Sequence, residues 1–531
     1  MKTDRRGFLA RTSMWMAGSV VAGLIPGCAD FEDEIPCLGT AAAPTPVPGM
    51  TYLWASKIGC ALDCDLKNGR NRSTGGRATD DGPRINAAMA GASESNPITL
   101  IIDGPALVSG LFLPAGGYWS IAGLGCGTGF FIKSGTNNDG IHNGGPNAAI
   151  PSDPGPPVPS RGSSVSLQNF TINGNQGNGF NGVSTTGAPQ GNLELEWYYS
   201  INLMNLDNIE VENVVVVNSP SYHMRFSNVG NVKISGCVLR SQGPNTDGLH
   251  FDGPSNDIAI SDCEITSGDD AIALNCPEGH RGNISRVTIS NCKVNSGTFL
   301  LRLHSVDGPL MYNIDTVTVS NCTGACAYAG FLVGHGAPSN PESITGVTIA
   351  NCALSAPAML EVGANFGSIV LDTLQLTPQP SSLLPGFALV RSSLFSAGCT
   401  YVGSSLDIKN CEIQRRAGSM LPALVLNYTS SIGQLTFDGF MLQAGSTTPA
   451  LVDIASGTLG QLVINSVNSA GIKNPISSGG FSSCGTVSGT GVLATGWEFP
   501  DDVMCDGVPY ISAETGLPSI KIDGVVEPYA P

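Results

Sequence analysis

Three aspartates in the middle of the chain have the spacing that acid–base chemistry needs. Asp247 lies in Asn245-Thr246-Asp247-Gly248, and Asp269 and Asp270 follow in Ser267-Gly268-Asp269-Asp270. If these segments lie on adjacent turns of a repeating structure, three carboxylates lie side by side, and at least one pKa is expected to rise. Glycoside hydrolysis needs one protonated carboxyl for the leaving oxygen and one carboxylate to activate water.

Basic residues gather in the same stretch. Five of the six histidines lie between positions 223 and 335, and Arg225, Arg281 and Arg302 lie in the same stretch; the histidines are His223, His250, His280, His304 and His335. Only 25 of the 531 residues are Lys or Arg, so this gathering predicts a site for a polar or anionic ligand. Arg302 and His304, two apart on a predicted strand, point to the same side and are candidates to hold it. His223 and Arg225 are candidates for a neighbouring subsite.

Each of these features also has an ordinary structural interpretation. Ser-Gly-Asp-Asp and Asn-Thr-Asp-Gly are common turn sequences. The Arg302/His304 and His223/Arg225 pairs can form solvated strand faces. Trp197-Tyr198-Tyr199 is suited to stacking on sugar rings, but also to core packing. The hypothesis of a shared site depends on the recurrence of the aspartate and basic segments at the spacing of one structural repeat.

An internal repeat predicts the fold that positions these residues. Six similar segments of alternating apolar and polar residues each end in a cysteine, at nearly equal intervals except that the last is about double: Cys237, Cys263, Cys292, Cys322, Cys352 and Cys411. The alternation and the β-branched residues predict strands. Strands that recur about every 30 residues, with no helical pattern between them, predict an all-β fold: a single-stranded right-handed parallel β-helix.

The cysteines are expected to form an interior ladder of buried thiols. Disulfide pairing within the ladder is the alternative, because equivalent positions on adjacent coils lie about 4.8 Å apart. Better disulfide candidates lie outside the ladder, namely Cys60 with Cys64 and Cys484 with Cys505.

The first residues resemble a bacterial export signal. Arg5-Arg6 precede the apolar run 14–25, as in twin-arginine (Tat) signals, and Ile25-Pro26-Gly27-Cys28 resembles a lipobox. Cys28 would then be lipidated, with simple cleavage as the alternative. We therefore expect a signal over 1–28, a tether over 29–49, and a periplasmic or cell-surface protein that contacts the membrane only through such an anchor.

The remaining chain divides into a cap, a solenoid and a tail. Thr79-Asp80-Asp81-Gly82-Pro83 offers N-capping oxygens and an early proline, and Ile85, Met89 and Ala92 follow on one face. This pattern predicts a helix that covers the first coil. We expect an N-terminal cap region over 50–110, the β-helix over 111–485 with its site at about 220–305, and a tail or second cap over 486–531.

Composition excludes several classes of protein. The 68 Gly and 35 Pro disfavour a mostly helical fold, and 41% hydrophobic residues exclude a disordered chain. A net charge of −17 argues against binding to nucleic acid or to an anionic membrane surface. We expect no cofactor and no metal site, because no run of carboxylates has the spacing of a calcium loop. A capped solenoid needs no partner, so a monomer is expected.

The central motifs resemble a known family. Asn218-Ser219-Pro220 before His223, Asn245-Thr246-Asp247-Gly248, and the segment Gly268-Asp269-Asp270-Ala271-Ile272-Ala273-Leu274 are similar to the signature of glycoside hydrolase family 28, the polygalacturonases and their pectin-lyase-like β-helix relatives. The resemblance covers about 205–305 in motif and 50–485 in architecture. It implies an inverting hydrolase in which Asp269 is the general acid and Asp247 and Asp270 activate the water.

The sequence departs from the family pattern at substrate-binding positions. The family completes its site with Gly-His-Gly and Arg-x-Lys, and Arg302-Leu303-His304 resembles the latter with histidine in place of lysine. His280, in Gly279-His280-Arg281-Gly282, follows Asp269 too closely to lie one coil further on, and a literal Gly334-His335-Gly336 comes later. His250 stands where polygalacturonases usually carry an aspartate. His250, Asn245 and His280, the last reaching the site from its loop, are further candidates to bind substrate. These departures retain the acid and base but leave galacturonate specificity open.

Three functional hypotheses follow. The first is an exported O-glycosyl hydrolase acting on pectin-like or other acidic polysaccharide, which retention of all three aspartates favours. The second is a polysaccharide lyase or epimerase on the same scaffold, because fold does not decide function. The third is a non-catalytic carbohydrate-binding β-helix.

Overall fold

The computed structural model describes most of the chain after the predicted signal. The described residues are 35–136, 138–144, 158–176, 199–243, 245–305, 312–334, 343–379, 387–392, 401–414, 424–426, 430–454, 456–477 and 480–530. Cys28, Trp197, Tyr198 and His335 lie outside them. The chain forms two compact units, the first comprising Met1–Ile150, Val158–His250 and Cys263–Asp270, and the second comprising Pro151–Pro157, Phe251–Asp262 and Ala271–Pro531.

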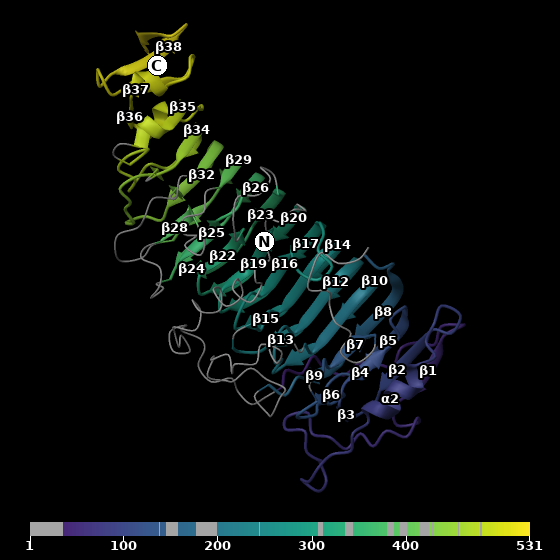
Figure 1. Ribbon diagram of the computed structural model, residues 1–531. Helices are drawn as coiled ribbons and strands as arrows, with labels where there is room; N and C mark the ends of the chain where they lie inside the picture. Colours follow the sequence, from purple (N-terminus) through teal and green to yellow (C-terminus); the bar gives the residue numbers. More distant parts are fainter. Residues whose placement is uncertain are drawn as a thin grey trace, which may run out of the picture. The chain divides into compact units, whose positions relative to one another are not determined.

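The first unit is built of parallel strands that return once per coil (Figure 1). One ladder pairs, in order, β1 (Thr51–Trp54), β2 (Ile98–Ile102), β5 (Gly117–Gly123), β8 (Gly162–Gln168), β10 (Ile201–Glu212) and β12 (Met224–Ser235). A second runs from β4 (Leu111–Leu113) through β7 (Ile141–Asn143) to the first residues of β10. A third pairs β3 (Pro105–Val108), β6 (Gly129–Ile132), β9 (Thr171–Asn173), β11 (Val215–Val217), β13 (Val238–Arg240) and β15 (Glu264–Ser267).

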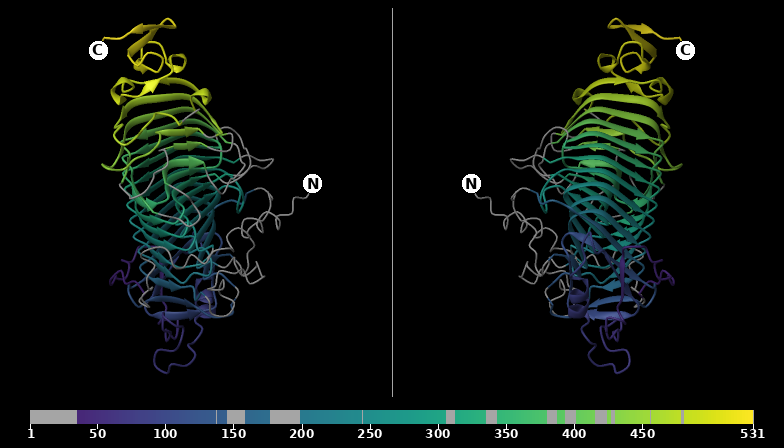
Figure 2. Two further views of the ribbon diagram at one scale, coloured as in Figure 1. Left: turned by 90° about the vertical axis from the view of Figure 1, so that its left-hand side faces the viewer. Right: turned by 90° about the vertical axis from the view of Figure 1, so that its right-hand side faces the viewer.

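The second unit repeats the pattern (Figure 2). Its longest ladder comprises the end of β14 (Leu249–Ser261), β17 (Ile284–Ser290), β20 (Ile314–Ser320), β23 (Ile344–Ala350), β26 (Phe366–Asp372), β29 (Val402–Lys409), β32 (Ser431–Leu442), β34 (Thr458–Val467) and β35 (Cys484–Ser488). A second ladder comprises β16 (Ile272–Asn275), β19 (Phe299–His304), β22 (Ala329–Val333), β25 (Ala358–Val362), β28 (Ala388–Ser392), β31 (Leu424–Leu426) and β33 (Val452–Ile454). A third comprises β18 (Lys293–Ser296), β21 (Thr323–Cys326), β24 (Ala353–Ala356), β27 (Gln375–Pro378) and β30 (Glu412–Ile413). The predicted parallel β-helix is confirmed.

A small separate sheet follows the coils in the second unit. It comprises β36 (Glu498–Phe499), β37 (Pro509–Ser512), β38 (Pro518–Ile522) and β39 (Val525–Pro528), with β37, β38 and β39 paired antiparallel. No helix in the described part of the chain is long and apolar enough to cross a bilayer.

The predicted N-terminal helix is present as α2 (Gly82–Met89), and it packs against β3 and β4. Ile85 and Met89 are fully buried, as their spacing predicts. Asp81 occupies the N-cap position, but its carboxylate accepts the backbone N–H groups of Ala61 and Leu62 at 2.7 and 3.0 Å instead of capping the helix. Asp81 therefore ties the preceding loop to the start of the helix.

The predicted cysteine ladder is confirmed. Cys237 and Cys263 in the first unit and Cys292, Cys322, Cys352 and Cys411 in the second are buried and not disulfide-bonded. The double interval before Cys411 is explained by register: β27 pairs Gln375 with both Ala353 and Glu412, so Leu374 occupies the missing rung. The residue before each rung turns the chain, as Asn321 does at φ 55°, a left-handed conformation that asparagine tolerates.

The two predicted disulfides outside the ladder are wrong. Cys60, Cys64, Cys484 and Cys505 are free, and Cys64 is instead packed in an apolar cluster with Leu107 and Phe131. The structure contains a disulfide between Cys37 and Cys126, 89 residues apart in sequence. These cysteines meet because the segment after residue 35 crosses the turn at Gly125, where the Cys126 N–H donates to the carbonyl of Gly39 at 2.9 Å.

Candidate active site

The three aspartates lie on neighbouring coils of the first unit. The Gly248 N–H donates to the carbonyl of Asp270 at 2.9 Å, and this contact aligns Asp247 with Asp270. The sequence predicted three carboxylates side by side on adjacent coils, and the register adds that Asp270 is the one aligned with Asp247. All three residues are largely buried, at 4% exposure for Asp247, 7% for Asp269 and 1% for Asp270. The arrangement concentrates carboxylates on adjacent coils, as the acid–base hypothesis requires.

Turn chemistry positions the Asp269-Asp270 pair. Thr246 accepts the N–H of Gly268 at 2.9 Å through its hydroxyl oxygen and donates that hydroxyl to the carbonyl of Gly243 at 2.8 Å. A Cβ at position 268 would lie 2.1 Å from the carbonyl oxygen of Gly243, so this close approach requires glycine. The Ser267 hydroxyl donates to the carbonyl of Asp269 at 2.8 Å. Ser-Gly-Asp-Asp is thus a turn, as its ordinary interpretation holds, and the turn places the acids.

Asp247 is held by a buried histidine. His250 Nδ1 lies 2.7 Å from Oδ2 of Asp247, and the two side chains are 1% and 5% exposed. An ionised carboxylate only accepts hydrogen bonds, so Nδ1 carries the proton. His250 was predicted to bind substrate, whereas this contact makes it the partner of Asp247, at the position where the family usually has another aspartate.

A column of rings supports this histidine from the preceding coils. The ring of His250 stacks on Tyr222 with centroids 3.9 Å apart and an interplanar angle of 8°. Tyr222 in turn stacks on Tyr199 at 5.2 Å. The guanidinium of Arg225 lies 5.1 Å from the centroid of the Tyr199 ring, a cation–π contact. Tyr199 therefore packs within the protein, the alternative to sugar stacking that the sequence left open.

His223 supports the backbone of Asp247. Its N–H and its ring Nδ1 both reach the carbonyl oxygen of Asp247 at 2.8 Å. Complete burial lowers the pKa of His223 to about 4, so the ring is neutral at neutral pH and donates through Nδ1. Asn245, which was predicted to bind substrate, lies two residues before Asp247. It is half-buried with φ at 54°, and its carbonyl accepts the Ser221 hydroxyl at 3.1 Å.

The second unit holds the other predicted binding residues. Arg302 and His304 lie on one face of β19, in register with Ala273 and Asn275 of β16, and the guanidinium Nη2 of Arg302 is 3.4 Å from Nδ1 of His304. Arg302 is half-buried and His304 is buried. His280 is half-buried in the turn after β16, which the Arg281 N–H closes by donating to the carbonyl of Glu278 at 3.0 Å.

The prediction missed a second histidine–aspartate pair in the first unit. Nδ1 of His142 lies 3.0 Å from Oδ2 of Asp139, and His142 is 2% exposed. The sequence contained the signal, because residues 137–142 and 245–250 both read Asn-x-Asp-Gly, an apolar residue and His. His142 is also the sixth histidine, the one outside the 223–335 stretch.

The fold and the site define a class: a pectin-lyase-like parallel β-helix with buried aspartates on adjacent coils. Residues 152–355 match the model of the family described as glycosyl hydrolases family 28. This match spans the three aspartates and Arg302 and confirms the family resemblance. Residues 152–355 of the chain are therefore similar to glycoside hydrolase family 28.

The chain is similar in sequence to plant and fungal polygalacturonases. It is 26% identical over 176 residues to an exopolygalacturonase of Arabidopsis thaliana, covering 32% of this chain and 39% of the relative. It is 27% identical over 177 residues to a polygalacturonase of Penicillium griseoroseum, covering 32% and 43%. The matches thus span about two fifths of the length of these relatives.

Two solved structures share the fold. A family 28 exopolygalacturonase of Yersinia enterocolitica aligns with a TM-score of 0.50 at 12% identity, over 77% of this chain and 78% of that chain. PfbA, a surface adhesin of Streptococcus pneumoniae, aligns with a TM-score of 0.51 at 13% identity, over 91% and 99%. Because an enzyme and an adhesin share the architecture at this level, these structures support the fold alone.

Proposed function

We propose that the protein is an exported glycoside hydrolase that cleaves a pectin-like or other uronate-containing polysaccharide with inversion of configuration. The observation that carries this proposal is the register that places buried Asp247 beside Asp270 on the neighbouring coil, within the region that matches family 28. Paired carboxylates that flank a glycosidic bond are the groups on which inverting hydrolysis depends.

The residues divide the reaction between them. Asp269 donates its proton to the leaving oxygen as the glycosidic bond breaks. Asp247 and Asp270 hold a water molecule and accept its proton as the water attacks the anomeric carbon. Solvent then returns a proton to Asp269 and removes one from the base. His250 donates its Nδ1–H to Oδ2 of Asp247, and this hydrogen bond holds the carboxylate in one orientation.

Arg302 and His304 are proposed to bind acidic or hydroxyl groups of the substrate. Their side chains share one face of β19, and a guanidinium recognises carboxylates through paired hydrogen bonds. Where the family has lysine, His304 supplies an imidazole, whose ring nitrogens can hydrogen bond to hydroxyl or carboxylate groups of the substrate.

Export and lipidation at Cys28 remain part of the proposal. The disulfide between Cys37 and Cys126 supports export, because such bonds persist outside the reducing cytosol. The protein is proposed to act as a monomer at the cell surface or in the periplasm.

The decisive experiment compares the wild type with Asp269→Asn on a panel of uronate-containing and neutral polysaccharides. Reducing ends without ultraviolet absorbance indicate hydrolysis, whereas absorbance reveals the unsaturated product of a lyase. Asp269→Asn should abolish release of reducing ends. Glu264→Gln, which changes a surface carboxylate paired with Arg240 in the same unit, is the matched control and should retain activity. Full activity of Asp269→Asn would refute the acid assignment.

A further inference from the structure

The second histidine–aspartate pair is part of a larger buried polar cluster. Oδ2 of Asp139 accepts the side-chain N–H of Asn202 at 2.7 Å as well as the His142 proton, and Oδ1 accepts the backbone N–H of Tyr199 at 2.9 Å. His142 on β7 and Asn202 on β10 are in register on neighbouring coils. The carboxylate of Asp139 thus accepts hydrogen bonds from residues on separate strands and holds them together.

This cluster occupies the same position in its coil as the pair formed by Asp247, the proposed base, and His250. β10 pairs with β12 so that Asn202 aligns with Arg225, and the Met224 N–H donates to the carbonyl of Gly248 at 3.1 Å on the next coil. His142 and His250 are therefore three strand spacings apart along one row, about 14 Å. A polysaccharide chain laid along this row would reach both pairs.

The two pairs differ in their chemical equipment. The coil after Asp247 supplies Asp269 and Asp270, whereas the coil after Asp139 places Tyr199 at the equivalent position, where the Gly140 N–H donates to the Tyr199 carbonyl at 2.9 Å. A single carboxylate already engaged by three donors cannot supply both the acid and the base of hydrolysis. The Asp139 cluster is therefore suited to binding and not to cleavage.

Three polar atoms of the cluster are buried without a hydrogen-bond partner among the described residues. They are Nε2 of His142, Oδ1 of Asn202 and Oδ1 of Asn138. In the tautomer that donates Nδ1–H to Asp139, Nε2 of His142 is an acceptor, and the two amide oxygens are acceptors as well. Buried acceptors without a donor are costly, so a ligand that supplies hydroxyl donors would satisfy them.

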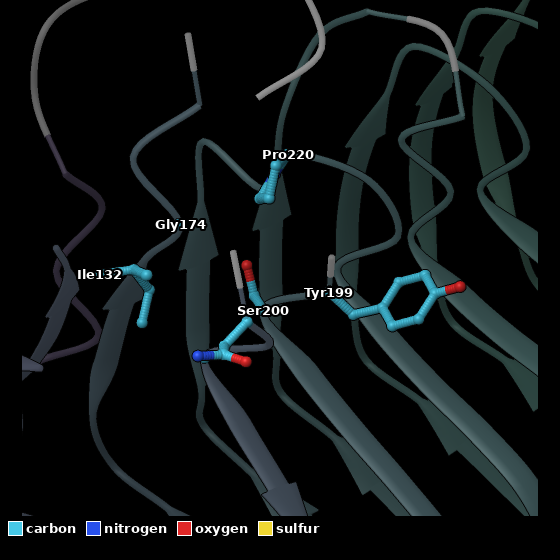
Figure 3. A pocket seen from close by; sticks show the side chains of 7 residues that line it. Ile132, Gly174, Tyr199, Ser200 and Pro220 are labelled. Carbon is cyan, nitrogen blue, oxygen red and sulfur yellow. The ribbon is translucent and has the colours of Figure 1, made fainter. Parts of the chain in front are cut away.

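The cluster borders an opening in the first unit. Asn138 is half-buried, and the side chain of Asp139 is 13% exposed. Asn138 lines a small hollow together with Tyr199, Ser200, Ile132, Gly174 and Pro220 (Figure 3). Among the residues of the cluster, Asn138 is the one that lines this hollow.

We propose that Asn138, Asp139, His142 and Asn202 form a carbohydrate subsite that binds hydroxyl groups of a sugar unit several residues away from the scissile bond. This inference rests on the proposed hydrolase function, for which it names a remote determinant of chain-length preference. His142, Asn202 and Asn138 contact the sugar, while Asp139 acts as a positioning residue that fixes the imidazole tautomer and the amide orientation.

The test measures cleavage of galacturonate oligomers, from the dimer to the octamer, and of their methyl esters. Wild-type kcat/KM should rise when the oligomer is long enough to reach His142. His142→Phe, which copies the Phe112 found in register one coil earlier, should raise KM for long oligomers about tenfold and leave the dimer unaffected. Asn138→Ala should act in the same direction with less risk to folding. Glu210→Gln, on the exposed side of β10, is the control.

Each outcome decides the inference separately from the proposed function. An unchanged length dependence in both variants would overturn the subsite while hydrolysis stands. A length gain that disappears on methyl esterification would overturn hydroxyl recognition in favour of a carboxylate ligand. If the wild type cleaves none of the oligomers, the proposed function fails. In that case, weaker octamer binding by His142→Phe in calorimetry supports the subsite, and equal or undetectable binding overturns it.

Discussion

His250 donates its Nδ1–H to Oδ2 of Asp247 at 2.7 Å while the face of its ring stacks on Tyr222. The hydrogen bond and the stack fix the imidazole in two different directions. The imidazole consequently holds the carboxylate of Asp247 in one orientation. A histidine thus takes up a position that the family usually gives to an aspartate, and it does so as a support for the proposed base.

Replacing His250 by phenylalanine separates these two contacts. His250→Phe keeps a ring against Tyr222 but removes the hydrogen bond to Asp247, whose loss we expect to lower kcat about 10- to 100-fold with little change in KM. Steady-state kinetics on the best polysaccharide measures this effect. Tyr222→Phe preserves the stack and serves as the control with activity near that of the wild type. A His250→Phe enzyme with normal kcat would show that Asp247 needs no such support.

Gly268 sets the position of Asp269. In Gly268→Ala the new methyl group would meet the carbonyl of Gly243, so the turn must shift and carry the proposed acid with it. We expect kcat to fall at least tenfold in a protein that still folds, because a small displacement of a reacting group is costly. Activity and thermal unfolding should be measured together. Gly116→Ala is the control, since an added Cβ there meets no atom within 4 Å and the backbone is outside the left-handed region. Unchanged kcat in Gly268→Ala would contradict the proposed geometry.

Burial of His223 makes folding stability depend on pH. Its pKa is about 4 in the folded protein, below the value of about 6.5 in the unfolded chain, so the unfolded state binds a proton first as pH falls. The contribution is complete above pH 6.5 and is lost as pH falls toward 4, for a total of about 3 kcal/mol. Denaturant unfolding between these pH values measures it. His223→Gln should show a correspondingly flatter profile, and the same slope in both proteins would refute the assignment.

The disulfide between Cys37 and Cys126 anchors the segment that follows the predicted signal. Reduction, or Cys37→Ser, should free residues 35–41 from the turn at Gly125 and lower the stability of this attachment by about 2–4 kcal/mol. Limited proteolysis under oxidising and reducing conditions should then cleave the segment faster in the reduced protein, with far-UV circular dichroism unchanged. Ser replacement of the free thiol Cys505 is the control. Equal cleavage rates would show that other contacts hold the segment.

The repeat could be predicted from the sequence because it depends on local sequence patterns. Alternating β-branched strands, a left-handed asparagine and a buried cysteine recur at the length of one coil, and each feature depends on neighbours within a few residues. The same locality allowed the helix at Gly82–Met89 and the aspartate motifs to be identified. The match to family 28 likewise follows from linear sequence.

Tertiary structure alone decided the contacts that depend on register between coils. The sequence placed Asp247 one coil from Asp269 and Asp270, but the strands align it with Asp270, because turn lengths and not a mean period set the register. The pairing of Cys37 with Cys126 likewise depends on a crossing of distant segments.

The roles of the two buried histidines were also decided by tertiary structure. His250 was identified as a site residue from sequence, but its role as partner of Asp247 depends on the ring column beneath it. His142 was missed, and its meeting with Asn202 depends on the pairing of β7 with β10, which are far apart in the chain. The spacing of residues in the sequence identifies the side chains available for chemistry, and the packing of the coils determines which atoms these side chains contact.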